Sequence, residues 1–413
     1  SKYKAREAWY DKNGEEFHPG INYYVGGQTK FYGAALFRFR EEDFRAIQHR
    51  DGVSPAWPLS YDDFEPYYDQ AERLYHVHGE RGADPTEPRT TNPFPYPALR
   101  HERRVQEVFD SLSSHGYHPF PVPLGLKLDE SRPDSSLCIR CNTCDGFACL
   151  LQAKADAETI ALRPALSHSN VDLLTHAKAI RLETDPTGGS VRRLIVEHEG
   201  REIALSADLF VVSCGAVNSA ALLLRSVSDR HPQGLGNRSG QVGRHYMCHN
   251  NSAVLAVFPG RENHTVFQKT LAINDFYHAG RGEEYPLGHI QLMGKWDATT
   301  LRVGAPWFAP TIGLDFIARH SLDFFLTTED LPDPNNRVMV GPKGEIHLHY
   351  TENNLESHKR LTQRFREMIA TIGGEHHLLP SSLYLGKKLP IGGVAHQCGT
   401  LRFGEDPDQS VLD

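Results

Sequence analysis

The chain has 413 residues, of which 39% are hydrophobic and 23% charged, and its formal net charge is −8. This composition is typical of a globular protein that is long enough for two domains. No apolar run approaches the roughly 18 residues of a membrane span, and the acidic balance without a basic stripe argues against nucleic acid as a partner.

The first 50 residues are rich in loops and contain the glycine cluster YVGGQTKFYGAAL at 24–36. Gly26, Gly27 and Gly33 permit positive φ angles and a close approach of the backbone, as needed where main chain lies against a flat cofactor. An ordinary tight turn uses the same residues, so this segment alone leaves both readings open.

Three segments carry helix signals. Ser60 is a plausible N-cap for a helix that continues to about residue 75, with an apolar stripe that includes Phe64, Tyr67 and Leu74. The proline-rich stretch 82–100 predicts an extended connection, and a second helix is expected from about 101 to 115. Residues 356–374 form an amphipathic helix pattern whose expected buried face contains Leu361, Phe365, Met368, Ile369 and Ile372, with Gly373 as its stop.

The remaining pattern is mainly that of strands. Residues 171–184, 191–199 and 202–206 alternate with turns, and an apolar strand at 207–213 then runs through a Gly-Ala turn into a helix. Such a strand–turn–helix corner offers free backbone N–H groups to a ligand, although it can also be purely structural. Strands at 252–258, 287–293, 322–328, 336–341 and 345–350 predict one antiparallel sheet.

The chain has seven cysteines, and Cys138, Cys141, Cys144 and Cys149 lie close together in C-x2-C-x2-C-x4-C spacing. An odd total with four crowded residues is unlike a disulfide framework and favours a reducing, cytoplasmic location. The spacing is similar to cluster-ligating runs, but the last gap differs from the ferredoxin pattern and no second knuckle exists for zinc. Reduced structural thiols are therefore favoured over metal, and no metal ligand is assigned.

Histidine is frequent, with 23 residues, so a single histidine says little. His245 and His249 are four residues apart, but no helical pattern surrounds them and no acidic third ligand is obvious. His396, in PIGGVAHQCGTLRFG, is by its local pattern either a loop histidine or a general base.

Taken together and in chain order, these segments resemble the glucose–methanol–choline (GMC) family of FAD-dependent oxidoreductases. The resemblance lies in YVGGQTKFYGAALFRFREEDF, LFVVSCGAVNSAALLLRS, GQVGRHYMCH and VAHQCGTLRFG, and it covers almost the whole chain. Within the family, the chain looks most like bacterial pyranose oxidases and glycoside 3-oxidases. The resemblance implies an α/β FAD-binding domain interleaved with a substrate domain built on a large antiparallel sheet.

The resemblance also implies a division of the chain and a set of site residues. The FAD-binding domain would comprise 1–50, 151–250 and 388–413, the connecting or lid region 51–150, and the substrate domain 251–387. The residues expected to contact FAD are Gly26, Gly27, Thr29, Gly33, Ala34, Ala179, Cys214, Gly215 and Ala216. Phe31 stands where some relatives carry a flavin-linked histidine, which implies non-covalent FAD.

His396 matches the histidine that accepts the proton of the substrate hydroxyl in this family, while hydride leaves to the flavin. Gln268 and Gln291 are candidates for hydrogen bonds to sugar hydroxyls, with surface glutamines as the alternative. The family's phosphate-binding GxGxxG belongs before Ser1, and a second His or Asn belongs about forty residues after His396, beyond Asp413.

The expected reaction is oxidation of a secondary ring hydroxyl, at position 2 or 3 of a pyranose or glycoside, to a ketone. Oxygen or another acceptor would take the electrons, and the sequence does not indicate an oligomeric state. The alternatives are a family member acting on a non-sugar alcohol, or an electron-transfer protein with metal or an iron–sulfur cluster on Cys138, Cys141, Cys144 and Cys149.

Overall fold

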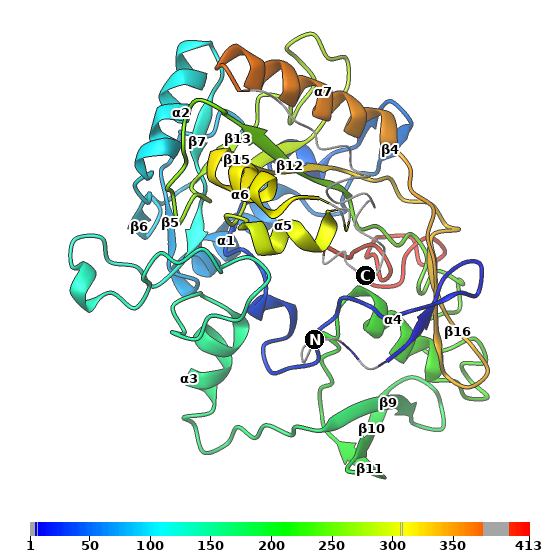
Figure 1. Ribbon diagram of the computed structural model, residues 1–413. Coiled ribbons are helices and arrows are strands. Elements are labelled where there is room, and N and C mark those ends of the chain that lie inside the picture. The colour runs from blue at the N-terminus through cyan, green and yellow to red at the C-terminus, as the bar shows by residue number, and fades with distance from the viewer. Residues whose placement is uncertain (1–4, 6, 306, 308, 375–395) are drawn as a thin grey trace.

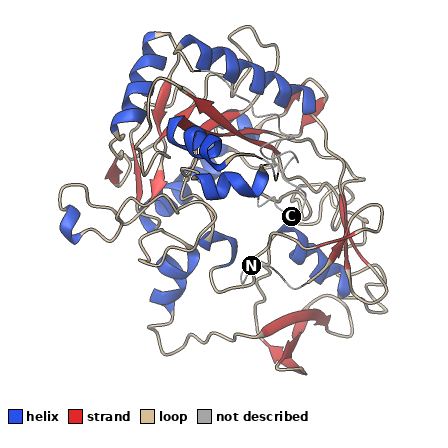
Figure 2. Cartoon of the chain, in the orientation of Figure 1, coloured by secondary structure: helices blue, strands red, loops and turns tan. Residues whose placement is uncertain are grey.

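The computed structural model describes residues 5, 7–305, 307, 309–374 and 396–413. Figures 1 and 2 show a mixed α/β molecule in which long loops join short strands and helices. The expected fold class is thus confirmed. Among these residues, no helix combines the length and the apolar character needed to cross a membrane.

The largest sheet has five antiparallel strands. Their order is β12 (Asn250–Val257), β15 (Ser321–Thr328), β14 (His289–Leu292), β13 (Leu271–Ile273) and β7 (Pro119–Pro121). One face packs on α2 (Arg103–Ser114) and α7 (Leu355–Thr371), which lie together at the top of Figure 1. Leu361, Phe365, Met368 and Ile369 of α7 are fully buried there, as expected from the amphipathic pattern.

The opposite face of the five-stranded sheet packs on two helices at one end and adjoins a cavity at the other. Leu255 and Val257 of β12 pack on α5 (Ala298–Gly304) and α6 (Thr311–His320). Thr327, near the end of β15, instead lines a cavity. Because side chains alternate along a strand, the same face therefore supports a small helical core at one end and a binding space at the other.

A second sheet corrects the prediction of a single antiparallel sheet. β16 (Arg337–Val340) and β17 (Ile346–His349) do not join the five-stranded sheet; the order is β16, β17, β1 (Trp9–Tyr10), β2 (Glu16–Phe17). β1 pairs with β17 in parallel. Trp9 and Ile346, which are opposite each other in this register, are fully buried against α4 (Ala216–Arg225). The partner of the 336–349 hairpin is thus the N-terminal segment.

The third sheet is formed by β11 (Arg201–Ser206), β10 (Val191–His198) and β9 (Ala177–Thr184), and it lies at the lower edge of Figure 1. The expected strand at 171–184 begins only at Ala177. The strand expected at 207–213 does not form: this segment is irregular and makes no ladder with the described residues, and Leu209 and Val211 are each 78% exposed. A strand is defined by its neighbour, and this segment has none among those residues.

Helix α1 (Tyr61–Leu74) begins after Ser60, as expected, and the backbone N–H and the hydroxyl of Ser60 both donate to Asp63. The predicted apolar stripe is wrong, because Tyr67 and Leu74 are exposed. The helix buries Asp69 and Glu72 instead, and both carboxylates accept from the buried Arg38. An internal cation thus determines which face of α1 turns inward.

The remaining elements are short. They are β3 (Ile47–His49), β4 (Gly52–Ser54), β5 (Val77–Gly79), β6 (Tyr96–Pro97), β8 (Leu124–Gly125), α3 (Arg163–Ala165), the 3₁₀ helices η1 (Gly27–Lys30), η2 (Glu41–Phe44) and η3 (Pro133–Ser135), and the π-helical turn η4 (Glu158–Leu162). The expected domain boundary at 387/388 lies outside the described residues, so the domain division stays a prediction.

Candidate active site

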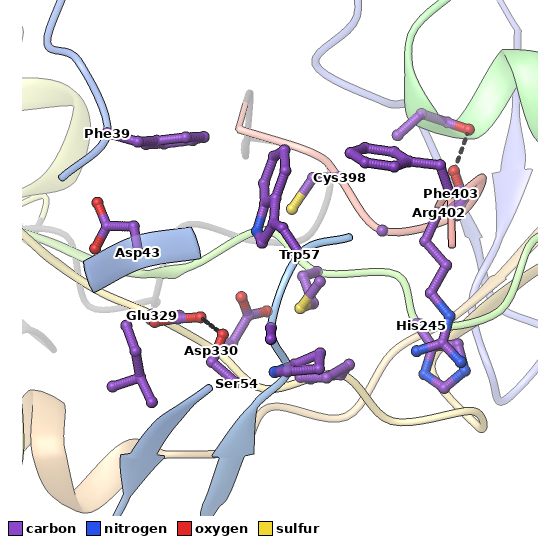
Figure 3. A pocket seen from close by; sticks show the side chains of 18 of the residues that line it. Phe39, Asp43, Ser54, Trp57, His245, Glu329, Asp330, Cys398, Arg402 and Phe403 are labelled. Carbon is purple, nitrogen blue, oxygen red and sulfur yellow. Dashed lines mark hydrogen bonds between the residues drawn. The ribbon is translucent and has the colours of Figure 1, made fainter. Parts of the chain in front are cut away.

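A cavity of about 1330 Å³ lies where these layers meet. Segments 39–58, 212–219, 245–249, 277–289, 327–332 and 398–412 contribute its lining residues, and Figure 3 shows part of this wall. Pockets for drug-sized ligands have volumes of roughly 300–1,000 Å³. The space is therefore sufficient for a large cofactor together with a small substrate.

One wall is the corner that leads into α4. Gly215 has a φ of 80°, and a Cβ atom built there would meet nothing within 4 Å, so open space adjoins this backbone. Ala216 follows as the first residue of α4, and both residues line the cavity. The first turn of a helix carries backbone N–H groups without helical partners, which suits an electron-rich ligand edge.

The C-terminal segment is fixed to this corner. The hydroxyl of Thr400 donates to the carbonyl oxygen of Ala216 at 2.7 Å. Gly399 has a φ of 89°, and a Cβ atom there would lie 1.9 Å from the carbonyl oxygen of His245. Only glycine permits that approach.

The same close approach brings two histidine-bearing segments together. Met247 and Cys398 exchange backbone hydrogen bonds of 3.1 and 3.0 Å, N to O, and so form an antiparallel bridge. Beyond this bridge the ring of His396 lies edge-to-face with that of His249, with centroids 5.8 Å apart and an interplanar angle of 71°. His249 lines the cavity, so His396 lies at its edge.

His396 is solvent-exposed as a residue, and its ring packs against His249 and Phe325. Burial by this protein, and then repulsion from His249, lower the pKa of His396 below its ordinary value. A lowered pKa keeps the imidazole neutral near neutral pH, as a proton acceptor must be.

Several polar side chains that were not predicted from the sequence also line the cavity. Asp43 accepts from the hydroxyl of Tyr277 at 2.8 Å, and burial raises the pKa of Asp43. Glu329 accepts from the hydroxyl of Ser54 at 2.6 Å and lies 3.1 Å from Nε2 of His49. Asp43 lies in η2, His49 and Ser54 lie in the β3–β4 hairpin, and Glu329 follows β15. They share no motif, so no sequence signal identifies them.

The two glutamine candidates have different surroundings. Gln291 is half-buried, and its Oε1 accepts at 3.2 Å from Nε2 of His289, a residue of the cavity wall. It is opposite Phe325 in the β14–β15 register. Gln268 is fully buried and its amide donates to Asp323 at 2.8 Å. The structure therefore brings Gln291, and not Gln268, close to the wall.

The other predicted cofactor contacts are not among the residues that line the cavity. Gly26 and Gly27 both have positive φ angles at the start of η1, where the hydroxyl of Thr29 donates to the carbonyl oxygen of Gly26. Gly33 packs against Asp145, and Ala34 is fully buried in the core beneath the loop. Ala179 lies in β9, and the backbone N–H of Cys214 donates to the hydroxyl of Ser219 at 3.0 Å. Of the predicted set, only Gly215 and Ala216 contribute to the cavity lining.

The cysteine segment packs beside the glycine loop. Cys138 and Cys144 are buried in one core cluster with Ala34, and burial raises the pKa of Cys144 to about 12. Nζ of the completely buried Lys154 donates to the carbonyl oxygens of Tyr32, Cys144 and Phe147, each at 2.8 Å. Within the described part of the chain, no three His, Cys, Asp or Glu side chains are grouped so that they could hold a metal ion.

Comparison with protein families adds a direct match. Residues 12–251 match the family model described as GMC oxidoreductase. The matched range contains the glycine loop, the cysteine segment and the corner at Gly215.

Two curated relatives extend the comparison. The chain is 30% identical over 423 aligned residues to 6‴-hydroxyparomomycin C oxidase of Streptomyces lividus, covering 97% of this chain and 72% of that protein. It is 34% identical over 237 aligned residues to paromamine 6′-oxidase of Streptomyces fradiae, covering 56% of this chain and 41% of that protein.

Among solved structures, pyridoxine 4-oxidase from Mesorbium loti matches with a TM-score of 0.60. The match covers all of this chain and 80% of the other at 17% identity. At this identity the likeness concerns the fold alone.

Proposed function

The chain belongs to the GMC oxidoreductase family, and from this premise we propose that it binds FAD non-covalently and oxidises a secondary ring hydroxyl of a pyranose or glycoside to a ketone. The observation that carries the proposal is the position of His396. Its ring packs against that of His249, with centroids 5.8 Å apart, and His249 lines a cavity of about 1330 Å³ together with Gly215, Ala216 and several polar side chains.

The residues around the cavity fit FAD, the cofactor of this family. The open space beside Gly215 leaves room for a flat ring close to backbone, and Trp57 and Met247 provide apolar surface. Nδ1 of His245 is buried without a hydrogen-bond partner and could donate to, or accept from, a ligand. FAD, when bound here, supplies the acceptor for a hydride.

His396 supports the other half of the reaction, the transfer of the hydroxyl proton. Oxidation of an alcohol breaks the O–H bond and the C–H bond of the same carbon, and the proton needs a base. With its lowered pKa, His396 is neutral at pH 7 and can accept that proton. No other base is required for this step.

The polar wall suits a substrate with several hydroxyl groups. Burial lowers the pKa of His289 to about 4, so its ring is neutral. Its Nδ1 lies 2.7 Å from Oδ1 of Asn274 and its Nε2 lies 3.2 Å from Oε1 of Gln291, so the ring links these two amides at the wall. Glu329 and Asp43 add acceptors, and Gln291 lies beside His289. Several convergent hydrogen-bonding groups on an otherwise apolar wall are typical of sites that bind small polar ligands.

A second candidate is oxidation of an exocyclic hydroxyl at position 6 to an aldehyde. Two relatives are named for a position 6 of an aminoglycoside. The proton chemistry at His396 would be unchanged, because only the reacting carbon differs.

The test is anaerobic reduction of the FAD-loaded protein by a panel of substrates. The panel contains a pyranose, an alkyl glycoside, the same glycosides lacking the 2-, 3- or 6-hydroxyl, an aminoglycoside and an aliphatic alcohol. We expect bleaching of the flavin by the sugars and its loss for one deoxy compound, which identifies the oxidised position. Reduction by the aliphatic alcohol alone would overturn the proposal.

A further inference from the structure

We propose that His249, anchored by the buried carboxylate of Asp330, is the positioning residue for His396 and holds its imidazole at the edge of the cavity. This inference rests on the function proposed above, because it concerns the base of that reaction.

The anchor is a carboxylate whose two oxygens are both fixed. Asp330 is 1% exposed. Its Oδ2 accepts from the backbone N–H of Cys248 and from the hydroxyl of Tyr350, both at 2.9 Å, and its Oδ1 accepts from the backbone N–H of His249 at 3.0 Å. Burial on its own would raise the pKa of Asp330, but the His249 ring and the two amides outweigh it and lower that pKa. The carboxylate is therefore charged at neutral pH.

His249 is held in an uncommon backbone conformation by this anchor. Its φ is 62°, in the left-handed region, which costs a residue other than glycine about 1 kcal/mol or more. The hydrogen bond from its backbone to Asp330 offsets this cost. In this conformation Nδ1 of His249 lies 3.7 Å from Oδ1 of Asp330 and, although buried, has no hydrogen-bond partner.

Nδ1 of His249 thus faces the carboxylate, and the same ring contacts His396. His396 packs edge-to-face against two rings, His249 at 5.8 Å and Phe325 of β15 at 6.4 Å between centroids. Of the two, only His249 can carry charge. The carboxylates of Asp330, 3.7 Å from Nδ1 of His249, and of Glu329 line the same cavity.

The arrangement has a chemical consequence for the proton transfer. When the O–H bond of the substrate breaks, the proton moves to His396 and the hydride leaves the same carbon for the flavin. His249 repels the new positive charge on His396, and the negative charge of Asp330 lies 3.7 Å from Nδ1 of His249. A base held in one orientation can also meet the hydroxyl without reorganising, which contributes to rate.

The experiment uses the full chain and the variant His249→Asn. Asparagine tolerates a φ near 60° better than most residues, so the fold is expected to survive; His249→Gly serves as the second variant, since glycine adopts this angle freely. The matched control is His118→Asn, which removes a histidine that also pairs with a buried carboxylate, Asp275 at 2.9 Å, but on a surface outside the cavity lining.

The first readout needs no cofactor. NMR titration of histidine-labelled protein, with the His396 signal identified by its absence in His396→Gln, gives the pKa of His396 directly. In His249→Asn and His249→Gly this pKa should rise, because repulsion from His249 is one of the causes that lower it. In His118→Asn it should stay at the wild-type value.

The second readout is flavin reduction in FAD-loaded protein. We expect His249→Asn to lower the limiting rate by about 10- to 100-fold with a much smaller change in the substrate concentration for half-maximal rate. An unchanged His396 pKa together with an unchanged rate in both His249 variants would overturn the positioning role. If His396→Gln also kept the wild-type rate, the proposed function itself would fail, so the two failures can be told apart.

Discussion

His396 illustrates how a side chain gains its chemistry from residues that are remote in sequence. By its local pattern the histidine could be a loop residue as well as a base. In the folded chain, His249 lies at its ring edge and the surrounding protein lowers its pKa. The sequence shows no acidic partner near His249. In the structure this partner is Asp330, 81 positions later, and no sequence motif links the two residues.

The lowered pKa of His396 leads to a prediction for the pH dependence of flavin reduction. The base must be neutral to accept a proton, so the rate should fall only when the pH drops through the folded-state pKa of His396, which lies below the ordinary value of 6.5. The midpoint of the acid limb should therefore lie below pH 6.5, with the rate approaching its plateau toward neutral pH. Stopped-flow reduction at a series of pH values measures it, and an acid limb centred above pH 6.5 would contradict the assignment.

A second residue-scale prediction concerns Lys154. Burial lowers its pKa to about 8, yet its Nζ donates to three backbone carbonyl oxygens that link the glycine loop to the cysteine segment. Lys154→Met leaves these acceptors unpaired, so the free energy of unfolding should fall by about 2 kcal/mol or more. Chemical denaturation measures the change.

The control for Lys154 is Lys359→Met, a lysine on α7 whose side chain is 74% exposed. A surface replacement of this kind should alter stability by no more than about 0.5 kcal/mol. Equal effects of the two substitutions would show that the three hydrogen bonds from Lys154 to carbonyl oxygens do not contribute to stability.

At the scale of elements, the sequence predicted the type of most segments but not all of their partners. The amphipathic pattern was sufficient to predict α7, and the N-cap was sufficient to predict where α1 begins, because both signals depend on nearby residues. The apolar pattern of 336–350 identified two strands, but alternation does not say which sheet a hairpin joins. That choice depends on β1, whose two residues Trp9 and Tyr10 are too short a run to be recognised.

The segment 207–213 was predicted as a strand but forms none with the described residues. Its apolar residues favour a strand, but the pattern records only a propensity, whereas a ladder needs a second backbone. The described residues do not provide one, and Leu209 and Val211 remain exposed. In the same way, the apolar stripe expected on α1 failed because the buried Arg38 required two acidic side chains on that face.

An element-scale prediction follows from Gly399, which joins the C-terminal segment to residues 245–248. Gly399→Ala places a methyl group against the carbonyl oxygen of His245 and forces an alanine to a φ of 89°. We expect the free energy of unfolding to fall by about 2 kcal/mol or more, together with loss of the ring contact between His249 and His396. Denaturation and the NMR signals of the two histidines check both effects.

Gly260→Ala provides the matched control for Gly399. A Cβ atom at Gly260 meets nothing within 4 Å, and its φ is not in the positive region that favours glycine. Its stability should therefore stay close to that of the wild type. If Gly399→Ala behaved in the same way, the close approach to His245 would not be essential.

At the scale of the whole molecule, the cavity is the product of six separated stretches of sequence. Gly215, Ala216 and His396 were accessible from motifs, but the polar wall of Asp43, Glu329 and His289 was not, because these positions converge only in the folded chain. For the same reason, the family resemblance predicted more about this site than any single local pattern. The resemblance covers several segments in their chain order, and the fold brings these segments together around the cavity.

Binding of FAD in this cavity predicts a stabilisation that does not depend on turnover. At a free FAD concentration 100 times the dissociation constant, the folded state should gain about 2.7 kcal/mol. Thermal unfolding of the full chain with increasing FAD measures the gain, with NAD at equal concentration as the control. A melting temperature that rises equally with both nucleotides, or with neither, would contradict a specific flavin site.

The most direct test of the central claim is the rate at which a sugar substrate reduces the FAD-loaded protein and its His396→Ala variant at pH 7. The account predicts rapid bleaching of the flavin in the wild type and a rate lower by about 100-fold or more in the variant, because the hydroxyl proton then has no base. An unchanged rate in the variant would contradict the assignment of His396 as the proton acceptor.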